Sequence, residues 1–375
     1  MRAVFRRLCF RLGVLRGVDW LMILSVFVLL LLGLAAIYSV DLSRGVDLLN
    51  VKKQLVAIAV GLAIALFLAS SNYALLRNDA FVLYLAGILL LVGVLLFGTS
   101  VRGSRGWFVF DAASFQPVEF MKFALIVALS SYFSRRARPY FALRELAESL
   151  GLAMIPICLT LLQPDFGSAF VLLALWISMA FFAGMRTRFF LVFFGALTGA
   201  FSIGWRFFFE AYQRARILTF LNPAFDPLGQ GYNVSQAIIA IGAGGWLGRG
   251  LGFGSQSQLK FLPESHTDFI FAVIAEELGF FGVLLLLGAF ALLFVRLLVH
   301  AKKARDGFTA FLVVGAASAL CIQLAVNIGM NLGMFPVTGI GLPLVSYGGS
   351  SLIFFLALLA VVQSVITRSR GTGGA

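Results

Sequence analysis

The sequence predicts an all-α, polytopic integral membrane protein with about ten transmembrane helices. Of its 375 residues, 61% are hydrophobic and only 12% are charged, whereas soluble domains are about half apolar and about one quarter charged. The apolar residues form separate runs of roughly 20, the length that crosses about 30 Å of bilayer hydrocarbon. The runs lack the alternation of membrane β-barrel strands, and an isolated span in lipid must satisfy its own backbone hydrogen bonds. The spans are therefore expected to be helices.

The ten expected spans lie in order along the chain, separated by short polar segments. They are residues 20–40, 51–69, 80–98, 116–133, 147–162, 166–183, 188–207, 269–298, 309–331 and 345–366. The first apolar run is longer than a signal-peptide core, so we expect it to remain as the first helix. We expect a single membrane domain over 20–366, preceded by a basic cytoplasmic segment, 1–19, and followed by a cytoplasmic tail, 367–375.

The distribution of charge predicts that both the N-terminus and the C-terminus are cytoplasmic. The net charge is +13, but Lys and Arg lie in short clusters between apolar runs, which fits membrane topology better than nucleic-acid binding. An inner N-terminus places clusters such as 135–144 and 296–305 on the inner side, as the positive-inside rule requires. One large extracytoplasmic loop, about 208–268, then lies between spans seven and eight and contains a short interfacial helix near 232–241. Function is expected in this loop.

The densest polar group lies where this loop enters the eighth span. Four carboxylates and a histidine occur within 14 residues, and they are Glu264, His266, Asp268, Glu276 and Glu277. Thr267 or Asp268 could simply cap the helix. Glu276 and Glu277 lie about 12 Å farther along the helix axis, at 1.5 Å per residue. At least one of them is therefore in the apolar layer, where a carboxylate is costly and is either paired or functional.

A second polar group lies at the outer start of the fourth span. Pro117 is tolerated in the first helical turn, and Glu119 and Lys122 share one helix face at spacing i, i+3. One interpretation is a structural ion pair between them. The alternative is that Lys122 faces a cavity and binds an anion, with Arg102 and Arg105 on the same outer surface.

Two further outer segments have structural interpretations that we favour. Asp165, in the turn between spans five and six, most simply caps the following helix. The Gly-rich run 241–254 lacks the preceding strand and the Lys-Ser/Thr of a nucleotide-binding loop. Close backbone packing at the membrane surface explains its glycines better than a bound nucleotide.

A third polar cluster lies between spans nine and ten. It includes Asn327, Asn331 and the run 345–351, in which Ser346 occurs. Small residues here allow close helix contacts in lipid, and a substrate-binding role is an equal alternative. His300, on the cytoplasmic side, has no partner evident from the sequence and is interpreted as incidental.

The notable groups all fall on the outer side, so the chemistry is expected to face outward. Basic residues beside carboxylates at the lipid boundary suit a phosphate-bearing lipid head group. The basic side chains neutralise phosphate, while a carboxylate handles a proton or a metal ion.

The sequence also resembles a known family over essentially its whole length. The segments FLPESHTDFIFAVIAEELG, FQPVEFMK, QPDFGS and PLVSYGGSS are similar to motifs of the SEDS family (shape, elongation, division and sporulation) of bacterial cell-wall proteins. GSQSQLKFLPE and NIGMNLGMFPVTGIGLPLVSYGGSS resemble the elongation branch (RodA-like) more than the division branch (FtsW-like). Val118 stands where the family usually has Ser, which leaves Glu119 and Lys122 intact.

The resemblance implies a peptidoglycan glycosyltransferase in the inner membrane of a bacterium. It would polymerise lipid II at the outer face, with undecaprenyl pyrophosphate as the leaving group and a class B penicillin-binding protein (transpeptidase) as partner. The family's HTDF motif implies Asp268 as the catalytic base. We expect a divalent cation, Mg or Mn, with Asp268 as a candidate ligand, and no nucleotide. The expected pyrophosphate or head-group contacts are Lys122, Glu119, Arg102, Arg105 and His266, and the supporting residues are Glu264, Glu276, Glu277, Asp165 and Ser346.

A lipid-precursor flippase or other transporter is the rival class, because broken helices and intramembrane charges also occur in transporters. A transporter would be expected to carry charges near the midplane and on both sides, whereas these groups cluster in the outer half. The enzyme interpretation is therefore favoured. A non-catalytic scaffold, the third alternative, would tolerate replacement of Asp268.

Overall fold

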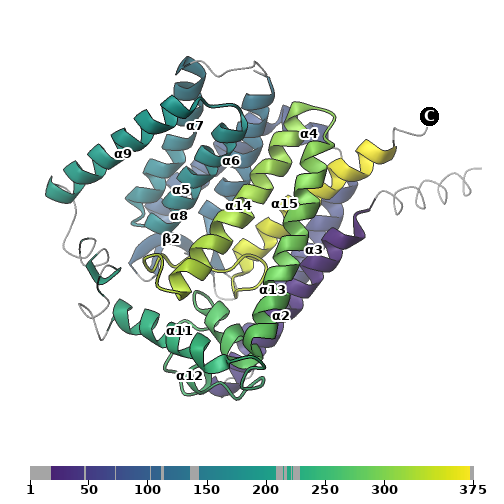
Figure 1. The fold of residues 1–375 in the computed structure, drawn as a ribbon. Helices are drawn as coiled ribbons and strands as arrows, with labels where there is room; N and C mark the ends of the chain where they lie inside the picture. The colour runs from purple at the N-terminus through teal and green to yellow at the C-terminus, as the bar shows by residue number, and fades with distance from the viewer. Residues whose placement is uncertain are drawn as a thin grey trace, which may run out of the picture.

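The computed structural model is a helical bundle (Figure 1), and it describes residues 18–45, 48–71, 73–101, 103–110, 114–135, 143–207, 214, 218–220, 222 and 229–371. Each of the ten predicted spans coincides with a helix. These helices are α2 (Trp20–Arg44), α3 (Leu49–Ser70), α5 (Ala80–Phe97), α6 (Pro117–Ser134), α7 (Leu143–Leu162), α8 (Phe166–Phe182), α9 (Thr187–Phe207), α13 (Ile270–Lys302), α14 (Gly307–Asn331) and α15 (Gly349–Gly371). Within the described residues, eight helices are long and apolar enough to cross a bilayer, and α8 is a shorter apolar helix. The chain is thus a multi-pass membrane protein, while the count of ten spans and their orientation stay predictions.

Within the part of the chain that the structure describes, three short helices lie outside these spans. They are α4 (Tyr73–Asn78), α11 (Gln230–Gly244) and α12 (Ser255–Gln258). Helix α11 confirms the short helix predicted within the large loop. Figure 1 shows α11 and α12 together at one end of the bundle and α4 at the opposite end. We refer to the end with α11 and α12, which is predicted to face outward, as the outer end.

The last span begins later than predicted. Residues 345–348 are not helical, and α15 starts at Gly349. The reason is tertiary: the backbone N–H of Tyr347 donates to the carbonyl of His266 (2.9 Å), and the Ser346 hydroxyl donates to the carbonyl of Thr267 (2.6 Å). The segment before α15 therefore packs against the start of α13 instead of extending the helix.

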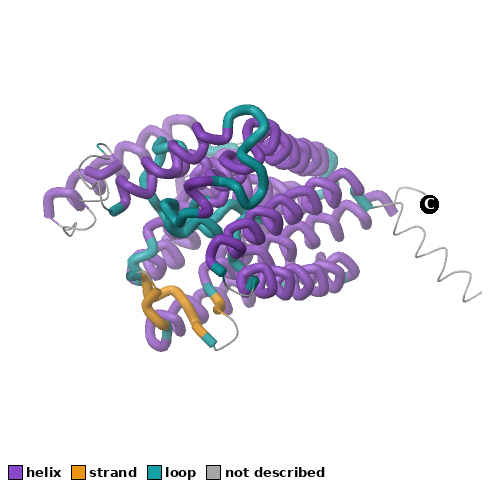
Figure 2. Tube along the Cα trace, turned by 90° about the horizontal axis from the view of Figure 1, so that it is seen from below, coloured by secondary structure: helices purple, strands orange, loops and turns teal. Residues whose placement is uncertain are grey.

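A small antiparallel sheet at the outer end was not predicted. Its strands are β1 (Thr99–Val101), β2 (Ser104–Val109) and β3 (Ser114–Phe115), in the order β1-β2-β3. The register pairs Val101 with Ser104 around Gly103, whose φ of 83° suits glycine at this turn. Figure 2 shows the strands gathered at one edge of the helical bundle. Strands this short carry too few residues for an alternating pattern to stand out.

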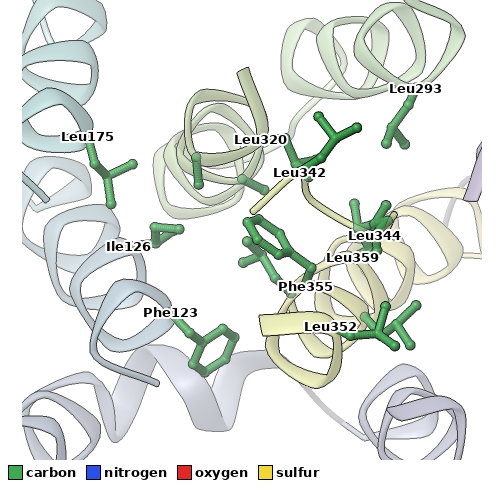
Figure 3. Packing of buried hydrophobic residues seen from close by; sticks show 14 of the residues in the cluster. Phe123, Ile126, Leu175, Leu293, Leu320, Leu342, Leu344, Leu352, Phe355 and Leu359 are labelled. Carbon is green, nitrogen blue, oxygen red and sulfur yellow. The ribbon is translucent and has the colours of Figure 1, made fainter. Parts of the chain in front are cut away.

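The core lies where α6, α14 and α15 meet. Figure 3 shows Phe123 of α6, Leu320 of α14 and Phe355 of α15 among the buried side chains between these helices. Leu342 and Leu344, from the loop between α14 and α15, are also buried in this cluster. The loop that contacts the start of α13 is thus anchored by its own apolar residues.

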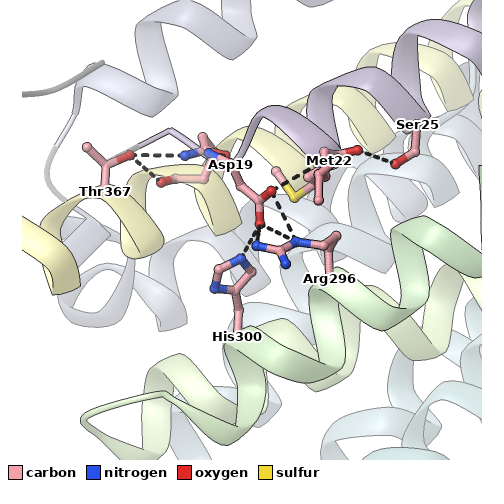
Figure 4. Close-up of polar contacts among 8 residues, drawn as sticks. Asp19, Met22, Ser25, Arg296, His300 and Thr367 are labelled. Carbon is pink, nitrogen blue, oxygen red and sulfur yellow. Dashed lines mark hydrogen bonds and ion pairs between the residues drawn. The ribbon is translucent and has the colours of Figure 1, made fainter. Parts of the chain in front are cut away.

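At the opposite, predicted cytoplasmic end, His300 has a buried acidic partner, so the interpretation of His300 as incidental is wrong. Its Nε2 contacts the Asp19 carboxylate, which also accepts hydrogen bonds from Arg296 Nη2 (2.7 Å) and from the Met22 backbone N–H (3.2 Å) (Figure 4). The Asp19 backbone N–H donates to Gln363 Oε1 (3.3 Å). Asp19 therefore caps α2 and ties it to α13 and α15.

Replacing Asp19 with Asn is expected to destabilise the fold by about 1–3 kcal/mol at neutral pH, because charged hydrogen bonds are lost. Burial opposes ionisation of Asp19, but hydrogen bonds from Arg296 and His300 outweigh burial, so its pKa lies below the ordinary value. The stabilisation is therefore complete above the ordinary aspartate pKa and is lost as pH falls through the lowered value. Thermal unfolding in detergent should show a gap in melting temperature between wild type and variant at pH 7 that narrows as the pH falls below the ordinary aspartate pKa. Asp306→Asn, which removes a partly exposed carboxylate at 3.8 Å from Arg77, serves as the control and should show no comparable gap.

Candidate active site at the outer end

Four helices, α6, α8, α13 and α15, begin side by side at the outer end. The residues that precede or open them are joined by hydrogen bonds. Gln116, before α6, donates its backbone N–H to Ser350 Oγ (3.2 Å) and its side-chain amide to Asp165 Oδ2 (3.4 Å). Tyr347, before α15, donates to His266, before α13. Because a helix N-terminus carries partial positive charge, four of them together favour an anionic group.

Two asparagines of α14 hold the backbone of Asp268. Asn327 Nδ2 and Asn331 Nδ2 donate to the Asp268 carbonyl at 2.9 Å and 3.0 Å, and Asn331 Oδ1 accepts from the backbone N–H of Ala272 (3.3 Å). Both asparagines are fully buried. The third polar cluster of the sequence thus fixes the start of α13 through side-chain amides.

Ser346 and Tyr347 hold the two residues before Asp268. The carbonyls of residues 266, 267 and 268 accept hydrogen bonds from Tyr347, Ser346 and Asn327, respectively. Ser346 Oγ also accepts from the backbone N–H of Leu342 (2.7 Å). His266 is buried, and its ring lies 5.4 Å from that of Tyr347. The backbone that carries Asp268 is therefore fixed before any ligand binds.

Asp268 itself is mostly buried, with 9% of its surface exposed. The N-cap residue of α13 is Phe269, so the alternative in which Thr267 or Asp268 simply caps this helix is wrong. The backbone N–H groups of residues 267–269 instead share the carbonyl of Glu264, whose φ of 51° is unusual for a non-glycine residue. A Cβ added to Gly339, which has a φ of 74°, would lie 3.8 Å from Asp268 Oδ2, so bare backbone borders the carboxylate.

Glu119 and Lys122 form an ion pair one turn inside α6, as one of the two interpretations of the sequence expected. Lys122 Nζ lies 2.7 Å from Glu119 Oε1, and both side chains are more than nine-tenths buried. The ammonium also lies 5.9 Å from the centre of the Phe355 ring of α15. Because a buried charge is stable only when it is paired, the glutamate keeps a cation inside the outer half of the bundle.

Asp165 caps α8 as predicted. Its carboxylate accepts from the Ser168 backbone N–H (2.9 Å) and hydroxyl (2.8 Å). The adjoining turn binds the sheet, because the backbone N–H of Arg105 donates to the Gln163 carbonyl (3.1 Å). The Arg105 residue is exposed on β2. Arg102 lies outside the described residues.

Glu276 and Glu277 are buried and bind protein groups of the outer loop. Glu276 accepts from the backbone N–H groups of Gln256 (2.7 Å) and Ser257 (3.0 Å) at the start of α12. Glu277 Oε1 accepts from the hydroxyls of Ser39 on α2 (2.5 Å) and Ser257 (3.1 Å). The two carboxylates thus join α13 to α12 and α2.

Helix α13 is broken at Gly279, where φ is 65° and ψ is −160°. The Gly-rich loop, residues 245–250, inserts its backbone at this break and replaces the missing helical hydrogen bonds. The four bonds are Arg249 N–H to Glu276 O (2.9 Å), Gly250 N–H to Glu277 O (2.9 Å), Phe280 N–H to Gly245 O (2.9 Å) and Phe281 N–H to Trp246 O (3.3 Å). The predicted close packing of the Gly-rich run is confirmed. The half-helix 270–278, which follows Asp268 directly, is oriented by this loop.

Replacing Gly244 with Ala is expected to displace this loop and destabilise the protein by about 1–3 kcal/mol, the usual cost of overpacking. A Cβ at Gly244 would lie 1.8 Å from the backbone oxygen of Ala275. Gly242, in the same helix, has no atom within 4 Å of an added Cβ, so Gly242→Ala is the matched control and should be neutral or slightly stabilising. Thermal unfolding of the two variants checks the prediction, and equal melting temperatures would contradict it.

The described residues contain no group of three or more His, Cys, Asp or Glu side chains that could hold a metal ion. A cation enclosed by protein ligands alone therefore does not fit this part of the chain. Asp268 alone does fit the way Mg²⁺ is usually bound, by one or two carboxylates together with substrate phosphates.

Sequence reasoning missed two polar residues beside the site. Gln54 of α3 is buried, donates to the Ser346 carbonyl (3.2 Å) and accepts from the Gly348 N–H (3.3 Å). Asp41 of α2 accepts from the Val51 backbone N–H in the first turn of α3 (3.0 Å). Burial of Tyr347 together with the Asp41 charge raises the pKa of the Tyr347 hydroxyl. A glutamine inside an apolar span is itself a signal, because polar side chains in spans commonly join helices.

Comparisons with known proteins agree over almost the full chain. The family model FTSW_RODA_SPOVE, described as a cell cycle protein, matches residues 19–371. The peptidoglycan glycosyltransferase MrdB of Escherichia coli strain K12 is 37% identical over 352 residues, which cover 94% of each chain. The solved rod shape determining protein RodA of Thermus thermophilus is 33% identical, with a TM-score of 0.70, and the match covers 93% of this chain and 96% of that one. A chain from a structure described as "Structural coordination of polymerization and crosslinking by a peptidoglycan synthase complex" is 35% identical, with a TM-score of 0.80 over 94% of this chain and 98% of that one.

Proposed function

This chain belongs to the FtsW/RodA/SpoVE family of cell cycle proteins, and from that premise we propose that it is a peptidoglycan glycosyltransferase that polymerises lipid II at the outer end. The observation that carries the proposal is the fixed position of Asp268. Hydrogen bonds from α14 and the α14–α15 loop hold three consecutive carbonyls here. They leave the carboxylate beside the bare backbone of Gly339.

In the proposed reaction, Asp268 acts as the general base. The carboxylate takes the proton from the sugar hydroxyl of the acceptor as that oxygen attacks the anomeric carbon of the donor. The new carbon–oxygen bond forms as the bond to pyrophosphate breaks, and undecaprenyl pyrophosphate leaves with both bonding electrons. Holding the Asp268 backbone rigid supports this step, because the base must lie within hydrogen-bond reach of the hydroxyl.

The leaving group needs positive charge, and two features of the outer end supply it. The four helix N-termini provide partial charge, and Lys122 provides a full charge that Glu119 retains in the bundle. Arg102, Arg105 and His266 are proposed as further head-group contacts. A bound Mg or Mn ion, held by Asp268 and substrate phosphates, would neutralise further negative charge on the pyrophosphate.

We also propose the elongation branch and a class B penicillin-binding protein as partner. The first is supported by the match to RodA and the second by the match to a chain of a peptidoglycan synthase complex. Activity at the extracytoplasmic face of the inner membrane follows from the predicted topology.

The test is to purify the chain with its transpeptidase partner, add lipid II and a divalent cation, and resolve the products on a gel. Glycan strands are expected. Lipid II movement across vesicle membranes without strand formation would favour the flippase alternative and contradict the proposal. Strand formation that is equally fast when the partner is assayed without this chain would also contradict the proposal.

A further inference from the structure

Large apolar side chains are exposed on the Gly-rich part of the outer loop, outside every span. The exposed fractions are 70% for Trp246, 81% for Leu247, 49% for Leu251 and 78% for Phe253. Between them lie glycines with positive φ, at 248, 250 and 252, which allow the tight backbone path that leaves these side chains on the surface. Single exposed apolar residues are ordinary, but four within eight residues indicate an interaction surface.

This surface is continuous with the apolar face of α13. The Trp246 ring packs on Phe280 at 5.1 Å and on Phe281 at 6.5 Å between ring centres. Both phenylalanines are about half exposed, as are Leu284 and Leu285 one turn farther along the span. Because α13 is long and apolar enough to cross a bilayer, its exposed side is expected to face lipid. The loop surface then extends that side toward the head groups.

The charge of the same segment fits the phosphate layer of a bilayer. From residue 229 to residue 263 the sequence has no acidic residue and two basic ones, Arg249 and Lys260. Both basic residues are exposed. Tryptophan, phenylalanine and basic side chains together are typical of the membrane interface, where aromatic rings sit at head-group level and cations meet phosphate.

We propose that residues 246–253 are seated in the outer leaflet, with bilayer lipid as the occupant of this apolar surface. The same loop supplies the backbone that orients half-helix 270–278 at the Gly279 break. Seating the loop therefore sets the depth of Asp268 relative to the head groups of a lipid-borne substrate, a consequence that rests on the proposed function. The loop acts as a positioning element, and its seating in lipid does not depend on the chemistry.

Spin labels at single positions test whether residues 246–253 are seated in the outer leaflet. In a background with Cys9, Cys158 and Cys321 replaced by Ser, single cysteines are introduced as Leu247→Cys and Phe253→Cys. Ser255→Cys, at an exposed polar position of α12, is the water-side control, and Leu285→Cys is the control inside the span. The chain alone is placed in bilayers containing anionic phospholipid, and collision with oxygen is compared with collision with a water-soluble nickel chelate.

Labels at 247 and 253 are expected to favour oxygen more than the label at 255 and less than the label at 285. Accessibility equal to that at 255 would overturn the proposal. So would labels that are water-exposed in the chain alone and become protected only after the transpeptidase partner is added, since the surface would then bind protein.

The consequence for catalysis has a separate readout. Leu247→Glu, at a side chain that points away from the core, is expected to lower polymerisation several-fold in bilayers and to leave it unchanged in detergent, where the protein does not need to fit a leaflet. An equal loss of polymerisation in bilayers and in detergent would show that the substitution disturbs the fold, and it would contradict the positioning role. If wild type forms no strands in either, the proposed function fails while the depth measurement still stands.

Discussion

Replacing Asp268 with Asn is expected to lower the rate of glycan polymerisation by about 10²- to 10⁴-fold, the usual contribution of a general base. The amide has nearly the same shape as the carboxylate but cannot accept the proton of the acceptor hydroxyl. The described bonds to Asn327, Asn331 and Glu264 use the backbone of Asp268, so they do not require its charge. The loss should therefore appear in the rate, with the melting temperature close to that of wild type.

Initial rates of strand formation, measured beside thermal unfolding, check this prediction. Asp79→Asn is the matched control, because it makes the same chemical change at an exposed residue just before α5. The control should retain the wild-type rate. A variant at Asp268 that polymerises as fast as the control would rule out the general-base role.

Replacing Lys122 with Met is expected to abolish most activity and to destabilise the protein by about 3–5 kcal/mol. The destabilisation arises because Glu119 would be left as a buried charge without its cation. The activity loss is predicted for a different reason, namely that the pyrophosphate would lose the buried positive charge that is proposed to bind it. The single variant cannot separate these two effects.

The double variant Glu119→Gln/Lys122→Met separates them. It removes both charges, so it should recover most of the stability, since a neutral pair of similar volume can replace a buried ion pair at little cost. It should stay inactive, because the Lys122 cation is absent from the double variant. Unfolding and polymerisation are measured on both variants, and recovery of activity together with stability would show that the pair is only structural.

The positions of the spans could be predicted because the bilayer imposes a length and a polarity on each one. What failed were features set by contacts between distant segments. The last span was predicted to start at residue 345, yet Ser346 and Tyr347 bind the start of α13 and α15 begins at Gly349. The break at Gly279 also depends on the Gly-rich loop, which supplies the replacement hydrogen bonds, and no local pattern reports that partner.

Within the site, the sequence indicated which residues are important better than it indicated which distant residues they contact. The spacing of Glu119 and Lys122 was enough to offer their ion pair as one of two interpretations, and the turn around Asp165 was enough to predict its cap. Glu276 and Glu277 were recognisable as costly intramembrane carboxylates, but their partners on α12 and α2 are distant in sequence. For the same reason the contact between His300 and Asp19 was missed, since the two residues are 281 positions apart.

The most direct test of Asp268 as the base is to measure lipid II binding and glycosidic bond formation separately in the Asp268→Asn variant. Binding is followed with labelled lipid II on the purified protein, and bond formation is followed in a single turnover with the variant in excess over donor. The prediction is wild-type affinity with bond formation slowed by about 10²- to 10⁴-fold. Affinity lost in proportion to the rate would make Asp268 a binding residue, and bond formation at the wild-type rate would show that it is not the base.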